Sequence, residues 1–155
     1  MYRSRELAVR TIACAIAALG CTTVTNEPAP IPALDETVFK TKVERVLVTQ
    51  CSYLACHGNA GAALRVYAPG QLRETVPLTL DDLRAPLTAD EEHANFLSAA
   101  AFAATAPLPN DNWLLRKPLA SAWGGFEHKG GAIFKDPNDA GYTTLYCWIS
   151  GNKPC

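Results

Sequence analysis

The chain has 155 residues, a formal net charge of −1, 19% charged residues and 48% hydrophobic residues. This length and composition suit one small globular domain with short additional segments, and they argue against a disordered chain or several large domains. The sequence contains no basic tail or basic run, so nucleic acid is not an expected partner.

Residues 1–20 have the pattern of an export signal rather than of a folded element. Three arginines precede an apolar run that ends at Leu19 and is too short to form a permanent membrane span. The run continues into Ala-Leu-Gly-Cys at 18–21, which resembles a bacterial lipobox. That resemblance implies cleavage before Cys21 and acylation of this cysteine. A plain secretory signal that is cleaved nearby is the alternative.

Acylation of Cys21 would anchor the protein to a membrane without spanning it. Thr22 follows the cysteine in place of an aspartate that would favour retention at the inner membrane. We therefore expect an outer-membrane anchor, with the domain in the periplasm or at the cell surface. Residues 21–34 are rich in threonine and proline and are predicted to form an extended tether. The domain itself is predicted at residues 35–155.

The first helix is predicted at residues 35–50. Apolar side chains recur at helical spacing between Val38 and Leu47, and Asp35 or Thr37 can cap the helix. The helix leads directly into a cysteine-containing stretch that begins at Cys51. Beyond that stretch the sequence predicts an extended segment at 64–67, a turn at Pro69-Gly70 and an irregular segment at 72–86.

Two further helices are predicted in the second half of the chain, so the expected fold is all-α. Thr88-Ala89-Asp90-Glu91 matches a capping box, which begins a helix that continues to about Ala104. Its predicted apolar face comprises His93, Phe96, Leu97, Ala100 and Ala104. A short buried segment is predicted at 113–115. The last helix is predicted at 142–150, is ended by Gly151, and has Leu145, Trp148 and Ile149 on its apolar face.

The stretch Cys51-Ser52-Tyr53-Leu54-Ala55-Cys56-His57-Gly58 carries two thiols and a histidine that directly follows the second thiol. In a c-type haem site, two cysteines form thioethers with the vinyl groups and the adjacent histidine ligates the iron. The usual spacing has two residues between the cysteines, so two of the four residues here would have to bulge out. A disulfide between Cys51 and Cys56 and a zinc or copper site are the open alternatives.

A haem would require a second axial ligand unless the iron were left open. The only methionine is Met1, which would be removed with the signal, so histidine is the natural candidate. His128 lies between two pairs of glycines within residues 124–131, and glycine allows a backbone to approach a flat cofactor closely. His93 is the weaker candidate, because a histidine on an apolar helix face is more often a core residue bonded to a carbonyl.

Several motifs together resemble a group of exported cytochrome-c-like domains that occur in planctomycete- and myxobacteria-type proteomes. They are Cys-x4-Cys-His-Gly after an amphipathic helix, Leu-Leu-Arg-Lys-Pro at 114–118, Gly-Gly-x-x-His-x-Gly-Gly at 124–131 and Tyr-x-x-Leu-x-x-Trp-Ile-x-Gly at 142–151. The similarity covers roughly residues 36–151. It implies a small cytochrome c-like domain with long irregular loops around one covalent haem c. In such domains a proline placed like Pro69 offers its carbonyl to the second nitrogen of the ligand histidine.

The interpretation that follows is a lipid-anchored electron carrier with a redox partner protein outside the cytoplasm. Its haem-binding residues are Cys51, Cys56, His57 and His128. Two histidine ligands favour electron transfer over gas binding, and the sequence shows no nucleophile–base arrangement typical of an enzyme. The alternative is a cofactor-free surface lipoprotein, stapled by disulfides, with a binding or structural role.

The last two cysteines are predicted to form a disulfide. Cys147 lies within the final predicted helix and Cys155 is the last residue, while Gly151 and Pro154 turn the chain back between them. Such a bond would prevent the terminal helix from fraying.

Overall fold

The computed structural model of the protein describes residues 33–106 and 108–151. The predicted signal, the lipidation site Cys21, nearly all of the tether and the disulfide partner Cys155 lie outside these residues. The described part of the chain is all-α and contains no strand, apart from an isolated bridge between Leu119 and Phe134. Among its helices, none combines the length and the apolar character needed to cross a membrane.

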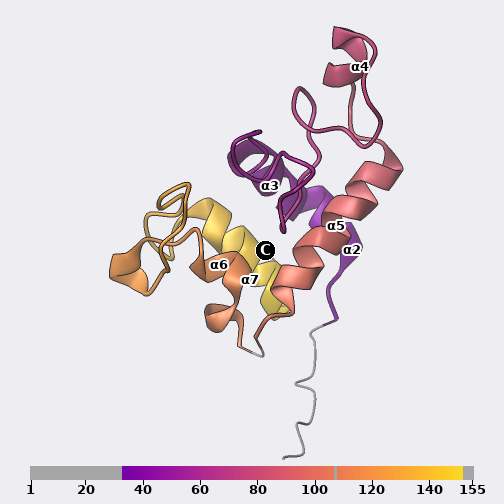
Figure 1. The fold of residues 1–155 in the computed structure, drawn as a ribbon. Coiled ribbons are helices and arrows are strands. Elements are labelled where there is room, and N and C mark those ends of the chain that lie inside the picture. Colours follow the sequence, from indigo (N-terminus) through magenta and orange to yellow (C-terminus); the bar gives the residue numbers. More distant parts are fainter. Residues whose placement is uncertain (1–32, 107, 152–155) are drawn as a thin grey trace, which may run out of the picture.

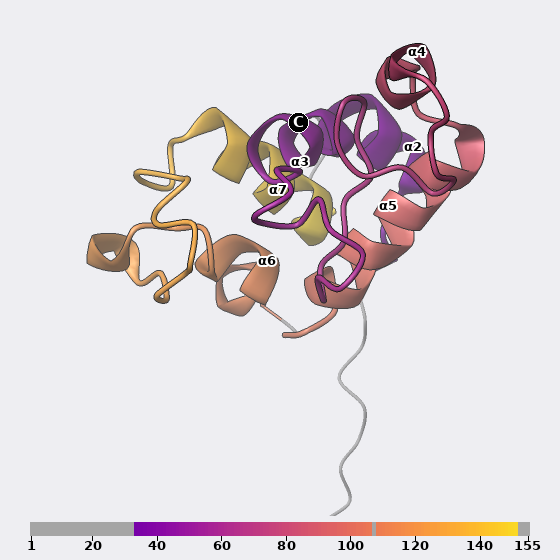
Figure 2. The same cartoon turned by 45° about the horizontal axis from the view of Figure 1, so that its top comes forward.

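The helical elements are short, and long loops connect most of them. In chain order they are α2 (Glu36–Val38), η1 (Phe39–Val43), α3 (Glu44–Gln50), α4 (Leu80–Arg84), α5 (Ala89–Ala103), η2 (Pro109–Asp111), α6 (Trp113–Arg116), η3 (Ser121–Trp123) and α7 (Ala140–Ser150). Figures 1 and 2 show α2, α3, α5 and α7 grouped together, with α4 on a loop that extends away from them.

The first predicted helix is confirmed and extends from Glu36 to Gln50 as the continuous series α2, η1 and α3. The side chain of Asp35 caps it by accepting a hydrogen bond from the Val38 N–H at 3.0 Å. The turn η1 is π-helical, so it contains an additional residue that pattern analysis does not predict. Immediately after this turn, Glu44 is buried in the helix.

The first helix, α5 and α7 meet around a cluster of aromatic side chains. The ring of Phe39 lies 5.7 Å from that of Phe96 and 5.3 Å from that of Trp148, between centroids. The indole N–H of Trp148 donates to the Asp35 carbonyl at 3.0 Å, which joins the last helix to the start of the first. The predicted apolar face of α7 is confirmed, because Leu145, Trp148 and Ile149 are all buried.

The capping box of α5 is confirmed, and Phe96 of its predicted apolar face packs against the core, but His93 and Leu97 of that face do not. The buried residues are Glu91, Asn95, Ala99 and Ala103, whereas the His93 side chain and Leu97 are each 53% exposed. The reason is that Glu91 and Asn95 have polar partners within the protein, so their burial does not leave hydrogen-bonding groups unpaired. The alanines on the same face then pack closely against neighbouring elements.

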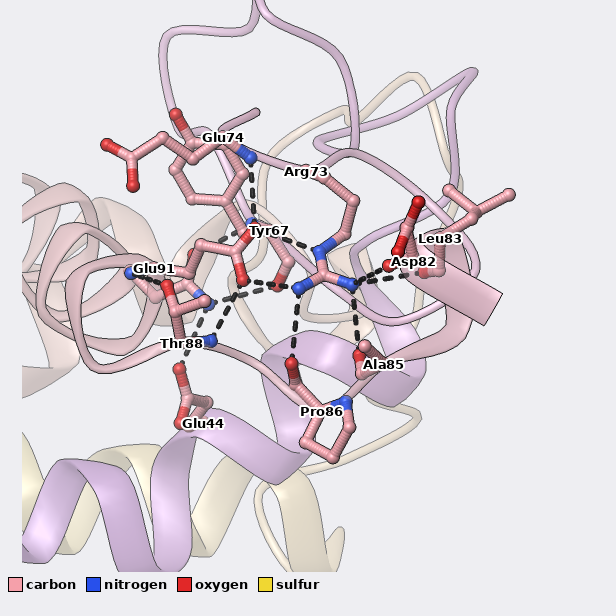
Figure 3. Close-up of polar contacts among 11 residues, drawn as sticks. Glu44, Tyr67, Arg73, Glu74, Asp82, Leu83, Ala85, Pro86, Thr88 and Glu91 are labelled. Carbon is pink, nitrogen blue, oxygen red and sulfur yellow. Dashed lines mark hydrogen bonds and ion pairs between the residues drawn. The ribbon is translucent and has the colours of Figure 1, made fainter. Parts of the chain in front are cut away.

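The loop that carries α4 is held by a buried ion pair. Both carboxylate oxygens of Glu91 accept hydrogen bonds at 2.8 Å from the Arg73 guanidinium. The same guanidinium donates to the carbonyls of Asp82, Leu83, Ala85 and Pro86 (Figure 3). Segment 72–86, predicted to be irregular, thus contains a short helix whose C-terminal end is fixed by one arginine.

Candidate functional site

The stretch from Cys51 to Gly58 forms a loop that closes through backbone hydrogen bonds. The N–H of His57 donates to the Cys51 carbonyl at 3.1 Å, and the N–H groups of Cys56 and Gly58 donate to the Tyr53 carbonyl at 2.8 and 3.0 Å. The side chains of Tyr53 and Leu54 are 57% and 61% exposed. The wide cysteine spacing is therefore accommodated by residues that project into solvent.

Close backbone contact explains the glycine that follows His57. Gly58 is buried, and a Cβ atom at this position would lie 1.7 Å from the carbonyl oxygen of Ser52. No side chain can relieve such a contact, because the obstructing atoms belong to the backbone. The loop can close in this form only with glycine at position 58.

We expect Gly58→Ala to lower the free energy of unfolding by about 2 kcal/mol or more, because the loop must open to admit a methyl group. Urea unfolding followed by circular dichroism measures the change. Gly61→Ala is the matched control, since the nearest atom to its Cβ would be 3.5 Å away, and its effect should stay within about 0.5 kcal/mol. Equal effects of the two substitutions would contradict this account of the loop.

His57 is oriented by the backbone of the segment that follows it. Its Nδ1 is 2.8 Å from the Leu64 carbonyl, and its own carbonyl accepts from the Val66 N–H at 2.8 Å. The predicted partner Pro69 is thus corrected to Leu64, because the chain folds back on His57 before it reaches the proline. A ring that donates from Nδ1 keeps the lone pair of Nε2 available as a ligand.

The protonation state of His57 also suits metal ligation. Burial lowers the pKa of its imidazole, the Leu64 carbonyl partly opposes this change, and the neighbouring His128 adds to it. The neutral ring, which is the form that binds metals, is therefore favoured.

His128 is oriented in a similar way by the glycines that follow it. Its Nδ1 is 3.2 Å from the carbonyl of Gly131, a residue with φ of 75° that adopts the left-handed conformation easily. A Cβ at Gly130 would approach the His128 ring to 3.2 Å. The glycine pair thus leaves room for the imidazole and turns a carbonyl towards it.

The structure brings His57 and His128 together although 71 positions separate them in the sequence. Their ring centroids are 5.9 Å apart, and the ring planes differ by 15°. A metal–imidazole bond is about 2 Å long, so one ion between two facing nitrogens would hold them about 4 Å apart and the centroids somewhat further. The two rings are stacked, and their centroids lie about as far apart as those of two imidazoles that share one ion.

His93 lies in a different environment. Its Nδ1 is 2.9 Å from a carboxylate oxygen of Glu36, and its ring stacks on Phe96 at 6.2 Å between centroids. His93, the weaker ligand candidate, is therefore an exposed residue that contacts Glu36 beside the first helix.

The cysteines of the loop are free thiols in the structure and are not bonded to each other. Burial, with a smaller contribution from Cys56, raises the pKa of Cys51 to about 11, so this thiol stays protonated at neutral pH. Cys147 is also free, and its predicted partner Cys155 lies outside the described residues.

Residues 33–106 and 108–151 contain no group of three or more His, Cys, Asp or Glu side chains arranged to hold a metal ion. A structural zinc site usually requires four such ligands.

A cavity of about 420 Å³ lies on the side of α7 that faces α6 and η3. Its lining includes Arg116, Trp123, Tyr142 and Tyr146, and neither the two stacked histidines nor the two loop cysteines. The guanidinium of Arg116 stacks on Phe126 at 4.0 Å and donates to the Gly124 carbonyl at 3.1 Å. This cation supports the loop that leads to His128.

The chain matches no protein-family model, no curated protein sequence and no solved structure. The functional argument therefore depends on the geometry of the site itself. That geometry comprises two stacked imidazoles, each with Nδ1 beside a backbone carbonyl, and two thiols in the loop that carries His57.

Proposed function

We propose that the protein is a small c-type cytochrome that carries electrons on one covalently attached haem. The observation that carries this proposal is the pairing of His57 and His128, with centroids 5.9 Å apart and nearly parallel rings. In both rings a carbonyl occupies the Nδ1 side, so each can offer Nε2 to one iron. Two thiols on the loop of one of these histidines complete the set of groups that a c-type haem requires.

The chemistry of these four side chains suits such a group. Cys51 and Cys56 would form the thioether bonds, His57 would be the proximal ligand and His128 the distal ligand. When bound, the haem supplies reversible one-electron exchange at its iron. The protein fixes the two imidazoles through the Leu64 and Gly131 carbonyls, which raises their strength as ligands.

Ligation by two histidines favours electron transfer, because it leaves no iron position open for a gas or a peroxide. It also gives a lower reduction potential than a histidine–methionine pair would. The all-α fold with long loops is consistent with a cytochrome c-like domain. We further propose that Cys21 carries a lipid, so that the domain meets its redox partner protein in the periplasm or at the surface, next to the outer membrane.

The test is expression of the full chain in a bacterial host with cytochrome c maturation machinery, followed by intact mass and a reduced-minus-oxidised visible spectrum. We expect the added mass of one haem and a sharp α band in the reduced form. The double variant Cys51→Ser, Cys56→Ser should lose the covalent mass. A mass that shows a Cys51–Cys56 disulfide and no visible absorbance would refute the proposal and support a cofactor-free lipoprotein.

A further inference from the structure

Besides Glu91, which pairs with Arg73, one further buried acid lies outside the residues assigned to the haem. Glu44 is 5% exposed and is the first residue of α3, the helix that ends directly before Cys51. Its carboxylate accepts a hydrogen bond from Asn95 of α5 at 2.9 Å. A buried carboxyl that accepts this hydrogen bond and, within the described residues, forms no ion pair is costly to ionise, because little offsets the loss of its hydration. Such a group in the core is therefore a candidate for a functional role.

The charges around Glu44 do not neutralise it. Lys40, one turn earlier on the same helix, is engaged by Glu36 at 3.1 Å and is 3.9 Å from Glu92. Glu92 of α5 repels a negative charge on Glu44, and α7 contains no Asp, Glu, Lys or Arg. Burial, the largest influence, and Glu92 raise the pKa of Glu44, whereas Asn95 and Lys40 lower it, and the net change is upward.

Hydrogen bonds connect Glu44 to the segment that orients the proximal histidine. Asn95 accepts from the Tyr67 N–H at 2.7 Å and donates to the Tyr67 carbonyl at 3.0 Å. Figure 3 places Glu44 below Tyr67 in this network. Three residues earlier, the Leu64 carbonyl bonds the His57 ring. Segment 64–67 is thus held by α5 on one side and by His57 on the other.

The same segment carries a cation, Arg65, whose contacts are with Tyr67 and α5. The guanidinium of Arg65 stacks on the Tyr67 ring at 5.0 Å, and the Arg65 N–H donates to Ser98 of α5 at 2.9 Å. Arg65 therefore braces the segment, while Asn95 alone bonds both Tyr67 and Glu44.

An iron held by the loop would lie beyond the end of the helix that begins at Glu44. Seven helical residues separate Glu44 from Cys51, a rise of about 10 Å. Across roughly this distance in a protein interior, the one-unit change in iron charge on reduction shifts a proton-binding constant on the order of tenfold. The shift favours proton binding in the reduced state, because the positive charge that stabilises the carboxylate is then smaller.

We propose that Glu44 takes up one proton when the haem iron is reduced and releases it when the iron is oxidised. This inference rests on the proposed function. In the forward step, a one-electron donor converts iron(III) to iron(II), and the Glu44 carboxylate binds a proton from solvent to become a carboxylic acid. The electron added to the iron and the proton added to Glu44 cancel, so the net charge of the core does not change. The protein would thus take up one proton with each electron.

The test is the midpoint potential of the haem-loaded protein as a function of pH, for the wild type, Glu44→Gln and Glu92→Gln. In the wild type the potential should fall with rising pH in a step over the range in which Glu44 titrates. The slope is limited to about 59 mV per pH unit, because one proton accompanies one electron. Glu44→Gln should lack this step, whereas Glu92→Gln, whose carboxylate is 37% exposed, should retain it. Haem propionates titrate in all three proteins and so do not distinguish them.

A second measurement does not depend on the potential. The reduced-minus-oxidised infrared difference spectrum should show a protonated carboxyl band in the wild type that is absent from Glu44→Gln. A haem-loaded wild type with the same pH profile and infrared bands as Glu44→Gln would overturn the inference and leave the cytochrome proposal standing. A wild type without covalent haem would overturn both.

Discussion

In the haem-loaded protein that we propose, replacing His128 with alanine is expected to leave the haem covalently attached and to open one of the two positions that histidines would hold on the iron. The reason is that Cys51, Cys56 and His57 lie in one loop, whereas His128 reaches the His57 imidazole from a distant glycine-rich turn. Loss of this ligand should abolish the low-spin signature in visible and electron paramagnetic resonance spectra. The reduced variant should also bind carbon monoxide, which the wild type should not.

His93→Ala is the matched control for this experiment. Its imidazole is 53% exposed and paired with Glu36, so its removal should leave the spectrum and the carbon monoxide behaviour unchanged. If His93→Ala opened the iron and His128→Ala did not, the assignment of the distal ligand would be wrong.

Replacing Glu91 with alanine should lower the free energy of unfolding by about 3–5 kcal/mol, because it leaves the Arg73 guanidinium buried without its partner. The two side chains are only 2% and 7% exposed, so solvent screens their interaction little. Urea unfolding at neutral pH measures the loss. Glu92→Ala removes an acid next in sequence that is 37% exposed and 3.9 Å from Lys40. Its effect should remain within about 0.5 kcal/mol, and a comparable loss would contradict the special role of Glu91.

The same ion pair predicts how stability depends on pH. Hydrogen bonds from Arg73, above all, lower the pKa of Glu91 to about 2 from 4.5, with further bonds from the Thr88 and Glu74 N–H groups. Because the folded value lies below the unfolded one, the stabilisation is complete above about pH 4.5 and is lost as the pH falls towards 2. It is worth roughly 3 kcal/mol, so the stability curves of wild type and Glu91→Ala should converge at low pH.

The helix boundaries that sequence analysis predicted well are those with local signals. Thr88 and Glu91 form a capping box, and Gly151 ends α7 with φ of 67°, and both signals can be read from a few adjacent residues. The helix α4 could have been predicted in the same way, since Thr79 and Asp82 form a second capping box. This helix was not predicted because it has only five residues and lies in a proline-containing segment with no helical repeat of apolar residues.

Features that depend on tertiary partners could not be predicted. The buried face of α5 contains Glu91 and Asn95, and a search for apolar periodicity assigns such residues to the surface. Their burial follows from Arg73 and Tyr67, residues that approach α5 only in the folded chain.

In the candidate site, too, local features were predictable and tertiary partners were not. The cysteines and histidines, and the glycines around His128, indicated the candidate ligands. The partner of His57 is a backbone carbonyl, at Leu64, which carries no signal of its own in the sequence. The additional residue in the π-helical turn, next to which Glu44 is buried, also lacks a sequence signature.

The hydrogen bond between Trp148 and Asp35 spans 113 positions and joins the two ends of the described core. A chain that emerges N-terminus first therefore cannot complete this core until α7 has emerged. A chain truncated before Trp148 would lose not only α7 but also the surface against which its first helix closes.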